Sequence, residues 1–406
     1  MTKEKSTVPR LRFPGFTDAW KQRKLGEYFV ERLECSAEGE LLSVTISDGV
    51  RRFSELDRKD NSSEDKTKYK VLKQGDIVYN SMRMWQGASG YSIYDGIVSP
   101  AYTVLIPTYL SYALFFSYLF KRSSSLQIFQ VNSQGLTSDT WNLKYKPFSN
   151  IVFPAPTLPE QEAIGSFFSD LDQLITLHQR KLDDVKELKK ALLQKMFPKG
   201  NGNDFPELRF PEFTDAWKQR KLGEVGYAKS GVGFPEKEQG GTTGIPFFKV
   251  SDMNTNGNEN ELVVANNYVT DEQISKRKWR VITEVPAIFF AKVGAAVMLN
   301  RKRLIRHPFL LDNNTMAYVF NHIQWETNFG KILFETIDLT QLTQVGALPS
   351  YNSSDVENIN ISLPTLPEQE AIGSFFSDLD QLITLHQRQL DHLKLLKKAL
   401  LQQMFI

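Results

Sequence analysis

Residues 158–197 read LPEQEAIGSFFSDLDQLITLHQRKLDDVKELKKALLQKMF, and residues 366–405 repeat this stretch with five changes in forty positions. Between and before the two copies lie segments 28–157 and 225–365, which show no comparable match to each other. A repeat of this length is too long for a solenoid unit and indicates duplicated domains. Two nearly identical frames therefore hold two different inserts, which predicts one kind of task performed on two targets.

A shorter repeat opens each half of the chain. Leu11–Glu27 reads LRFPGFTDAWKQRKLGE, and Leu208–Glu224 differs from it only by Glu212 in place of Gly15. Each frame thus has two parts, one before the insert and one after it.

The forty-residue repeat predicts a long helix. Thr157 and Glu160 have the spacing of a capping box, and Pro159 lies in the first turn, where its missing N–H is harmless. Apolar residues then recur at alternating steps of four and three, which is typical of a coiled-coil seam. The seam positions of the first copy are Ile164, Phe168, Leu171, Ile175, His178, Leu182, Val185, Leu192 and Met196. Those of the second copy are Ile372, Phe376, Leu379, Ile383, His386, Leu390, Leu393, Leu400 and Met404. Lys189 and Lys397 interrupt the two seams, and about 37 helical residues give a rod of roughly 55 Å.

The inserts predict mixed α/β structure with more strand than helix. Their strands are expected where β-branched or aromatic runs are bounded by Gly, Pro, Asn or Asp. In the first insert these runs are 41–46, 75–80, 101–106 and 150–156. In the second they are 245–250, 261–266, 287–293, 316–320 and 358–364. One helix is expected near the end of each insert, over Ser111–Phe120 and Thr327–Thr336, so the two inserts are expected to share one fold.

These elements predict an α+β protein with two similar mixed α/β domains joined by two long helices. An antiparallel coiled coil of the two helices would relate the halves by a pseudo-two-fold axis, although parallel pairing or pairing with another chain stays open from the residues alone. The expected organisation has five parts. They are a first domain over 1–157 that includes the repeat 11–27, a helix over 158–197, a linker over 198–207, a second domain over 208–365 that includes the repeat 208–224, and a helix over 366–406.

Bulk composition narrows the class of protein. At 406 residues the chain suits two to three domains of roughly 150 residues each. The 49 basic and 47 acidic residues nearly cancel, so any electrostatic footprint must be local. Cys35 is the single cysteine, which fits a reducing, cytoplasmic environment without disulfides or thiolate zinc sites. The sequence has no signal-peptide pattern and no apolar run of 18 residues, and it predicts a soluble protein.

No catalytic signature is present in the sequence. Phosphate-loop, dinucleotide-binding and H-E-x-x-H patterns are missing, and no Cys/His cluster predicts a metal site. Ser99-Pro-Ala-Tyr102 resembles the Asn/Asp-Pro-Pro-Tyr/Phe motif of amino-methyltransferases, but its third position differs and a strand-opening turn is the better interpretation. His178 and His386 are interpreted as polar, register-setting residues of the seam.

Local clusters of Arg, Lys, Asn and Gln indicate nucleic-acid contacts, because these side chains contact base edges and phosphates. The alternative for each cluster is a solvated charged face. The candidates of the first insert are Arg51, Arg52, Asn80, Arg83, Trp85, Gln86, Gln134, Thr137 and Ser138. Those of the second insert are Lys276, Arg277, Lys292, Asn300, Arg301, Lys302 and Arg303.

The chain resembles the specificity subunit of type I restriction–modification enzymes over essentially its whole length. The resemblance is carried by the helix entries Thr157–Gln161 and Thr365–Gln369, by the L-x-x-G-D-I pattern of Leu72–Ile77, and by the G-x-P-F-x-x-V start around Pro246–Val250. Residues 281–288 depart from the family pattern, since they lack its Gly-Asp.

The resemblance implies a DNA-recognition subunit without catalytic activity. Each insert would be a target recognition domain for one half of a bipartite DNA site, and the helices would set the gap between the half-sites. Two methylation subunits would dock on the frames, and two restriction subunits would join them. S-adenosylmethionine, ATP and magnesium would be bound by these partners and not by this chain. The docking candidates are Phe167, Phe168, Leu171, Phe375, Phe376 and Leu379. Two alternatives remain, a self-contained DNA methyltransferase and a scaffold for two protein targets.

Overall fold

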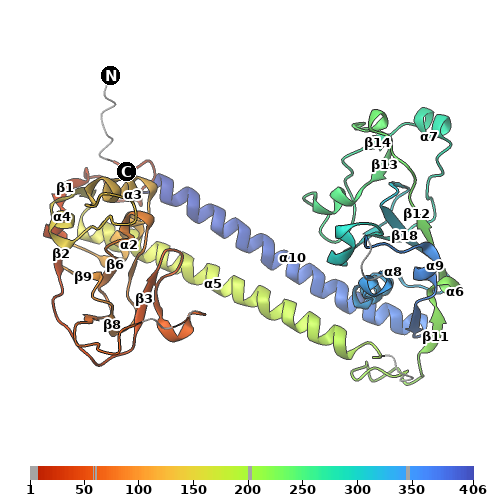
Figure 1. Ribbon diagram of the computed structural model, residues 1–406, viewed down its shortest axis with the longest axis horizontal. Helices are drawn as coiled ribbons and strands as arrows, with labels where there is room; N and C mark the ends of the chain where they lie inside the picture. Colours follow the sequence, from red (N-terminus) through yellow and green to blue (C-terminus); the bar gives the residue numbers. More distant parts are fainter. Residues whose placement is uncertain (1–7, 58, 60–61, 200–203, 344–347) are drawn as a thin grey trace. The chain divides into compact units, whose positions relative to one another are not determined.

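The computed structural model describes residues 8–57, 59, 62–199, 204–343 and 348–406, and it divides into two compact units (Figure 1). Unit 1 is Met1–Arg180 with Gln387–Ile406, and unit 2 is Lys181–His386. Each unit contains one insert, one copy of the short repeat and parts of both long helices. The predicted domain boundaries were drawn from the sequence repeats, whereas the two units are defined by contacts in space. The predicted boundaries therefore stay a prediction. Within the predicted linker, residues 200–203 lie outside the described part of the chain.

Unit 1 is built on an antiparallel four-stranded sheet in the order β2-β9-β6-β7. Its strands are β2 (Phe29–Glu31), β9 (Tyr102–Pro107), β6 (Ile77–Asn80) and β7 (Ser89–Tyr91). Three two-stranded pairs complete the strands: β1 (Lys21–Lys24) with β10 (Val152–Ala155), β3 (Leu42–Thr45) with β4 (Gly49–Arg52), and β5 (Lys70–Leu72) with β8 (Gly96–Val98). The helices are α1 (Leu25–Tyr28), η1 (Phe53–Glu55), η2 (Met84–Gln86), α2 (Ala113–Phe120), α3 (Ser123–Asn132), α4 (Tyr145–Asn150) and the start of α5 (Leu158–Lys195).

Unit 2 repeats this plan with the antiparallel order β12-β18-β15-β16. Its strands are β12 (Gly226–Ser230), β18 (Thr315–Phe320), β15 (Ala287–Ala291) and β16 (Lys302–Ile305), with β14 (Tyr268–Val269), β13 (Ile245–Phe248) and β17 (Leu310–Leu311) in a second sheet and β11 (Lys218–Lys221) paired with β19 (Asn360–Leu363). The helices are α6 (Leu222–Val225), η3 (Glu236–Glu238), η4 (Val250–Asn254), α7 (Asp271–Arg277), η5 (Ala295–Leu299), α8 (Thr327–Thr336), η6 (Leu339–Leu342), α9 (Ser353–Glu357) and the start of α10 (Leu366–Gln403). The matching sheet orders confirm that the two inserts share one fold.

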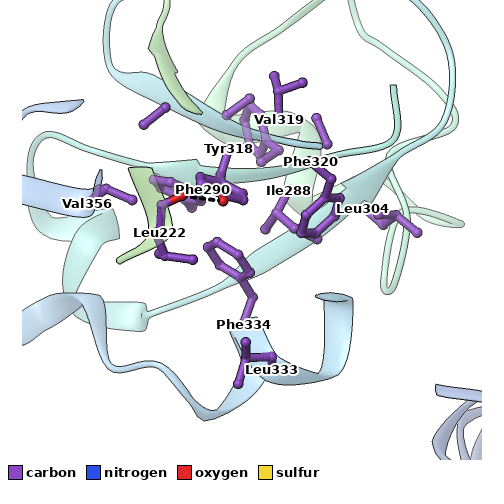
Figure 2. Close-up of a cluster of buried hydrophobic side chains, with 14 of the residues drawn as sticks. Leu222, Ile288, Phe290, Leu304, Tyr318, Val319, Phe320, Leu333, Phe334 and Val356 are labelled. Carbon is purple, nitrogen blue, oxygen red and sulfur yellow. Dashed lines mark hydrogen bonds between the residues drawn. The ribbon is translucent and has the colours of Figure 1, made fainter. Parts of the chain in front are cut away.

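The core of unit 2 lies between the four-stranded sheet and its helices (Figure 2). Ile288 and Phe290 of β15 and Phe334 of α8 are almost completely shielded from solvent. The Tyr318 hydroxyl is buried with them and donates a 2.7 Å hydrogen bond to the carbonyl oxygen of Leu222. This hydrogen bond compensates for burial of the hydroxyl group, and it connects the short repeat to the sheet.

One predicted strand is wrong. Residues 261–266 form only an isolated bridge, between Glu261 and Leu304. The Asn258 side chain takes up the backbone groups that a sheet would use: its oxygen accepts from the N–H groups of Val263 and Val264, and its nitrogen donates to the Val264 carbonyl. The other predicted strands and both predicted helices are present. The structure also contains elements that were not predicted: the helices α1, α3, α4, α6, α7 and α9 and the strands β1, β2, β4, β5, β7, β8, β11, β12, β14, β16 and β17.

The short repeat closes each unit by the same salt bridge. Arg12 donates to both carboxylate oxygens of Glu160 at 2.6 Å, and it also donates to the Asp18 carbonyl. Arg209 makes the same two contacts with Glu368, each at 2.7 Å. Both glutamates are buried, which explains why the Pro-Glu-Gln helix entry and the Leu-Arg-Phe start are duplicated together.

The next residue of each helix entry binds the insert. Gln161 accepts from the Tyr112 N–H at 2.9 Å and donates to the carbonyl oxygens of Leu110 and Pro156. Gln369 repeats this pattern with the N–H of Glu326. These contacts make Tyr112 and Glu326 equivalent positions in two otherwise dissimilar inserts.

The two long helices contact each other in antiparallel order. In unit 1, Asp172 of α5 accepts from Lys397 of α10 at 2.5 Å, and Gln179 further along α5 accepts from Lys394, which lies earlier in α10. In unit 2, Lys189 donates to Asp380 at 2.7 Å. The antiparallel direction agrees with the prediction, whereas seam packing of the coiled-coil type stays a prediction. In the described part of the chain no helix is long and apolar enough to cross a membrane.

Candidate nucleic-acid interface

A polar loop follows strand β6 in unit 1. The Asn80 side-chain oxygen accepts from the Met82 N–H at 3.0 Å, and the Arg83 N–H donates to the Asn80 carbonyl. Arg83 is exposed, and its guanidinium donates to Gln86 at 3.1 Å. The loop is thus fixed by its own backbone and presents Arg83 to solvent with Gln86 beside it.

A second loop, residues 134–142, contains the candidates Gln134, Thr137 and Ser138 and lies against the first. Trp85 and Trp141 form an edge-to-face pair with ring centroids 5.1 Å apart, and the Leu143 N–H donates to the Ser81 carbonyl at 2.8 Å. The Trp85 indole N–H donates to the Met82 carbonyl. Two loops more than fifty residues apart in sequence therefore form one surface, as expected for a recognition site.

The tip of the second loop has a defined shape. Gln134 pairs with Asn142 through backbone hydrogen bonds, and the Thr137 N–H donates to the Thr140 hydroxyl at 3.1 Å. Thr137 and Ser138 are exposed, and so is Leu136, which was not among the predicted residues. A single exposed leucine among polar loop residues forms no periodic pattern. The only sequence signal for Leu136 is its place between Gly135 and Thr137, at the tip of the loop.

Arg51 and Arg52 lie on β4 at some distance in sequence from these loops. Arg51 pairs with Glu55 at 3.0 Å. Arg52 pairs with Glu40 at 3.2 Å and stacks over the Tyr94 ring at 5.0 Å. Both arginines keep an exposed guanidinium, which suits contacts to phosphates more than bidentate base reading, because one carboxylate already occupies each of them.

The Gly-Asp pattern before β6 is structural. Asp76 is buried and accepts hydrogen bonds from Nε and Nη2 of the Arg32 guanidinium, at 2.8 and 3.0 Å, and from the Lys73 N–H. Gly75 has φ +96°, a backbone conformation that favours glycine. In unit 2 the same place, before β15, holds a cis peptide bond between Val285 and Pro286. Although the Gly-Asp is missing there, the strand that follows, β15, is in place in its sheet.

Lys276 and Arg277 end helix α7. Arg277 donates to Glu238 at 2.7 Å, while Lys276 is exposed. Hydrogen bonds from Gln273, and then from Arg277, hold the pKa of Glu238 below its ordinary value. Arg277 therefore anchors η3, and Lys276 is the member of this pair that faces solvent.

The basic run 300–303 is largely turned inward. The Asn300 side-chain oxygen accepts from the Leu339 N–H and from Lys302, and Lys302 also donates to the Ile337 carbonyl at 2.5 Å. Burial lowers the pKa of Lys302 to about 8. Arg303 donates to the Asn258 carbonyl at 2.7 Å, and burial lowers its pKa as well.

Arg301 differs from its neighbours, because its contact is with the Asn254 side chain near the surface, at 2.7 Å. A cavity of about 210 Å³ borders this run and is also lined by Glu259, Lys331 and Glu335. Lys292 follows β15, where its backbone binds Asn314 and Tyr351. The structure thus brings Asn300–Arg303 together at one cavity and places Lys292 and Lys276 elsewhere in unit 2.

The predicted docking residues are divided between core and surface. Phe168, Phe376 and Leu171 are buried in their own units, and Phe167, Phe375 and Leu379 are partly buried. The rings of Phe168 and Phe376 lie 5.9 Å from Phe405 and 6.3 Å from Phe197, respectively. Other leucines of the long helices are exposed and were not predicted, because they lie outside the inward-facing seam. They are Leu174, Leu177, Leu188, Leu366, Leu382, Leu385, Leu395 and Leu396.

Ser99–Tyr102 is a turn that opens strand β9, since the Tyr102 N–H donates to the Ser99 carbonyl at 2.9 Å. This agrees with the structural interpretation of the methyltransferase-like motif.

Two similar domains with unlike polar loops, held in a duplicated frame, define a two-domain recognition protein.

A family model described as the type I restriction modification DNA specificity domain matches residues 42–187 and 214–395. These matches cover well over half of the chain, and the protein belongs to this family. It is a DNA-recognition specificity subunit of the type I restriction–modification class, with two specificity domains.

Similar proteins are consistent with this assignment. The proposed MjaX specificity subunit of a type I restriction enzyme from Methanocaldococcus jannaschii is 24% identical over 421 residues, which cover 95% of this chain and 88% of that protein. The MjaVIII specificity subunit from the same organism is 23% identical, with 82% and 81% covered. Among solved structures, the type I restriction–modification S subunit from M. genitalium matches 98% of this chain and 99% of its own, with TM-score 0.62 and 14% identity. A chain from a study of type I R-M complex assembly and conformational transition matches 96% and 98%, with TM-score 0.53 and 15% identity. At these identities the structural matches support the fold alone.

Proposed function

We propose that each specificity domain reads one half of a bipartite DNA site and that the long helices fix the gap between the two halves. The observation that carries this proposal is the contrast between frame and insert. The frame contacts Arg12–Glu160 and Arg209–Glu368 are duplicated, while the exposed polar loops of the two inserts are unrelated. Identical frames suit identical partners, and unlike inserts suit an asymmetric DNA sequence.

The best-supported reading surface is in the first domain. Arg83 and Gln86 have the chemistry of base-edge readers, and the Trp85–Trp141 contact fixes their loop beside Thr137 and Ser138. In the second domain Arg301 and Lys276 are the better candidates for DNA contact, since Arg277, Lys302 and Arg303 are engaged within their own unit.

Methylation subunits are the proposed partners of the duplicated helices. Leu174 and Leu177 of α5 have their duplicates in Leu382 and Leu385 of α10, and all four are exposed. Two equivalent apolar surfaces support docking of two copies of one partner, with Phe167 and Phe375 at their edges. Restriction subunits would join this assembly. The partners would supply S-adenosylmethionine, ATP and magnesium chemistry, the chain itself would be non-catalytic, and the complex would act in the cytoplasm.

An exchange of the second insert tests the division of labour. Residues 225–365 are replaced by the corresponding insert of another specificity subunit, and the complex with the methylation subunit selects duplexes from a randomised library. We expect one half-site to change while the other half-site and the gap stay the same. Selection of two altered half-sites would contradict modular reading.

An inserted heptad tests the role of the helices. Seven residues added within 172–193 of α5, with a matching heptad in α10, keep the seam register. We expect the selected gap to change while both half-sites are retained. An unchanged gap in an assembled complex would refute the spacing role.

A further inference from the structure

Unit 1 contains a cavity of about 750 Å³ with a strong excess of positive charge. The turn between β3 and β4, the end of α2 and the last turns of α10 line it. Its cations are Lys121, Arg122, Lys394, Lys397 and Lys398. Among the described residues that line it, the acidic side chains are Asp48 and Asp172, so three positive side-chain charges are left over.

The nearby acids do not neutralise this excess. Asp172 is engaged by Lys397 at 2.5 Å and by the Tyr118 hydroxyl at 2.8 Å. Lys121 donates to the carbonyl oxygen of Ile46, and Arg122 to the backbone oxygen of Ile406. Within the described residues, neither Lys121 nor Lys398 forms an ion pair with a carboxylate. Burial lowers the pKa of Lys121, the charge of Asp48 raises it in part, and the charge of Lys397 lowers it again.

The second unit provides an internal comparison. Because Tyr112 and Glu326 occupy equivalent positions, Lys121 and Glu335, each nine residues further on, are equivalent as well. Glu335 accepts from Lys189 at 2.6 Å, and Lys189 is the duplicate of Lys397. Unit 2 thus places a carboxylate against this helix lysine, where unit 1 places another lysine.

We propose that the cavity of unit 1 binds a phosphate group of the DNA backbone. The inference rests on the proposed DNA-reading function and adds a contact site to it. Lysine ammonium groups are suited to phosphates as point charges, and the lining hydroxyls of Ser47 and Ser123 supply further donors. Gly49 and Val50 line the cavity on β4, and Arg51 and Arg52 follow directly on the same strand. The cavity is therefore continuous with the strand that carries predicted phosphate contacts.

A phosphate contact contributes affinity without sequence preference, and each contact adds about 0.9 to the slope of log affinity against log salt concentration. Substitutions in the cavity should therefore lower both the affinity and this slope, while the preferred DNA sequence stays the same. A residue that only supports the fold would not change the salt slope.

The test uses the full-length chain in complex with its methylation subunit and a duplex that contains its site, titrated between 50 and 300 mM salt. Lys398 is exposed, so Lys398→Gln leaves the core unchanged. Lys121→Glu introduces the residue type that unit 2 has at the equivalent position, Glu335. Lys190→Gln is the matched control, because Lys190 is the duplicate of Lys398 on α5. We expect Lys398→Gln to lower the slope by about 0.9 and Lys121→Glu to lower affinity more than tenfold at low salt, with the control unchanged.

Several results decide the proposal. The proposal is overturned if the Lys394→Gln/Lys398→Gln double variant has the same slope of log affinity against log salt concentration as the wild type. Loss of the methylation subunit from folded variants also overturns it and assigns the cavity to a protein partner. Should Lys121→Glu unfold, the Lys394/Lys398 double variant decides. Absence of any sequence preference in the wild-type complex would instead refute the proposed function.

Discussion

Lys189 of α5 lies 2.7 Å from Asp380 of α10, measured from Nζ to Oδ1, and their duplicates Lys397 and Asp172 form the same ion pair in unit 1. In the sequence both lysines interrupt an apolar seam. In the structure they bind the opposite helix, and Lys331 provides a second cation for Asp380 at 2.7 Å. The interruptions are therefore contacts that fix how the two helices align.

Lys189→Met is expected to destabilise unit 2. The change removes the cation that pairs with both Asp380 and Glu335, and it leaves the partly buried Asp380 with Lys331 alone. A loss of about 1–2 kcal/mol in the free energy of unfolding follows, because charge-assisted hydrogen bonds are lost while Asp380 keeps a second cation. Chemical denaturation measures it, with exposed Lys190→Met as the control. Equal stability of the two variants would contradict the role of Lys189.

Glu160→Ala tests the duplicated frame. The carboxylate is buried and binds Arg12 through both oxygens, so its removal leaves the guanidinium without its partner. We expect the free energy of unfolding of unit 1 to fall by about 3–5 kcal/mol. Glu27→Ala is the control, since Glu27 pairs with Arg23 in an exposed position of the same repeat and its loss should change stability little. A comparable loss from both variants would show that the frame does not depend on this pair.

Arg83→Ala tests the reading surface of the first domain. Arg83 is exposed, and Gln86 holds its guanidinium at 3.1 Å. If it contacts a base edge, its loss lowers discrimination at one position of one half-site by about 1–3 kcal/mol. Arg52→Ala should weaken all sequences alike. Competition binding with single-base variants of the site measures both, and a uniform loss for Arg83→Ala would contradict base reading.

Lys302 predicts a pH dependence of stability. Its pKa is lowered from 10.5 to about 8 by burial, so the unfolded chain holds this proton more firmly between these values. The contribution of Lys302 to the free energy of unfolding is therefore lowest below pH 8 and rises as the pH increases toward 10.5. We expect the wild type to gain on the order of 3 kcal/mol over this window relative to Lys302→Met. Parallel stability profiles for the two proteins between pH 7 and 10.5 would contradict a buried, charged Lys302.

The duplicated segments explain why much of the fold was predictable. A heptad spacing and a capping signature are local patterns, and the predicted helices coincide with α5 and α10 to within a few residues. The prediction of a strand at 261–266 was wrong because the Asn258 side chain accepts hydrogen bonds from the backbone N–H groups of Val263 and Val264, which a neighbouring strand would otherwise bind. Hydrophobicity alone does not distinguish such a loop from a strand.

The site was less predictable than the fold. Basic runs are visible in the sequence, but whether a cation faces solvent depends on tertiary partners. Lys302 and Arg303 turn toward backbone carbonyls, and Arg277 turns toward Glu238. Conversely, Lys121 and Lys398 belong to no basic cluster of the inserts and meet only when α2 packs against α10.

The most direct test of the central claim is genome-wide mapping of adenine methylation in cells that co-express this chain with its methylation subunit. Two unlike domains in one frame predict a new methylated motif with two different halves separated by a gap of constant length. A single continuous motif, or no new methylation from a stable complex, would contradict the assignment of one half-site to each domain.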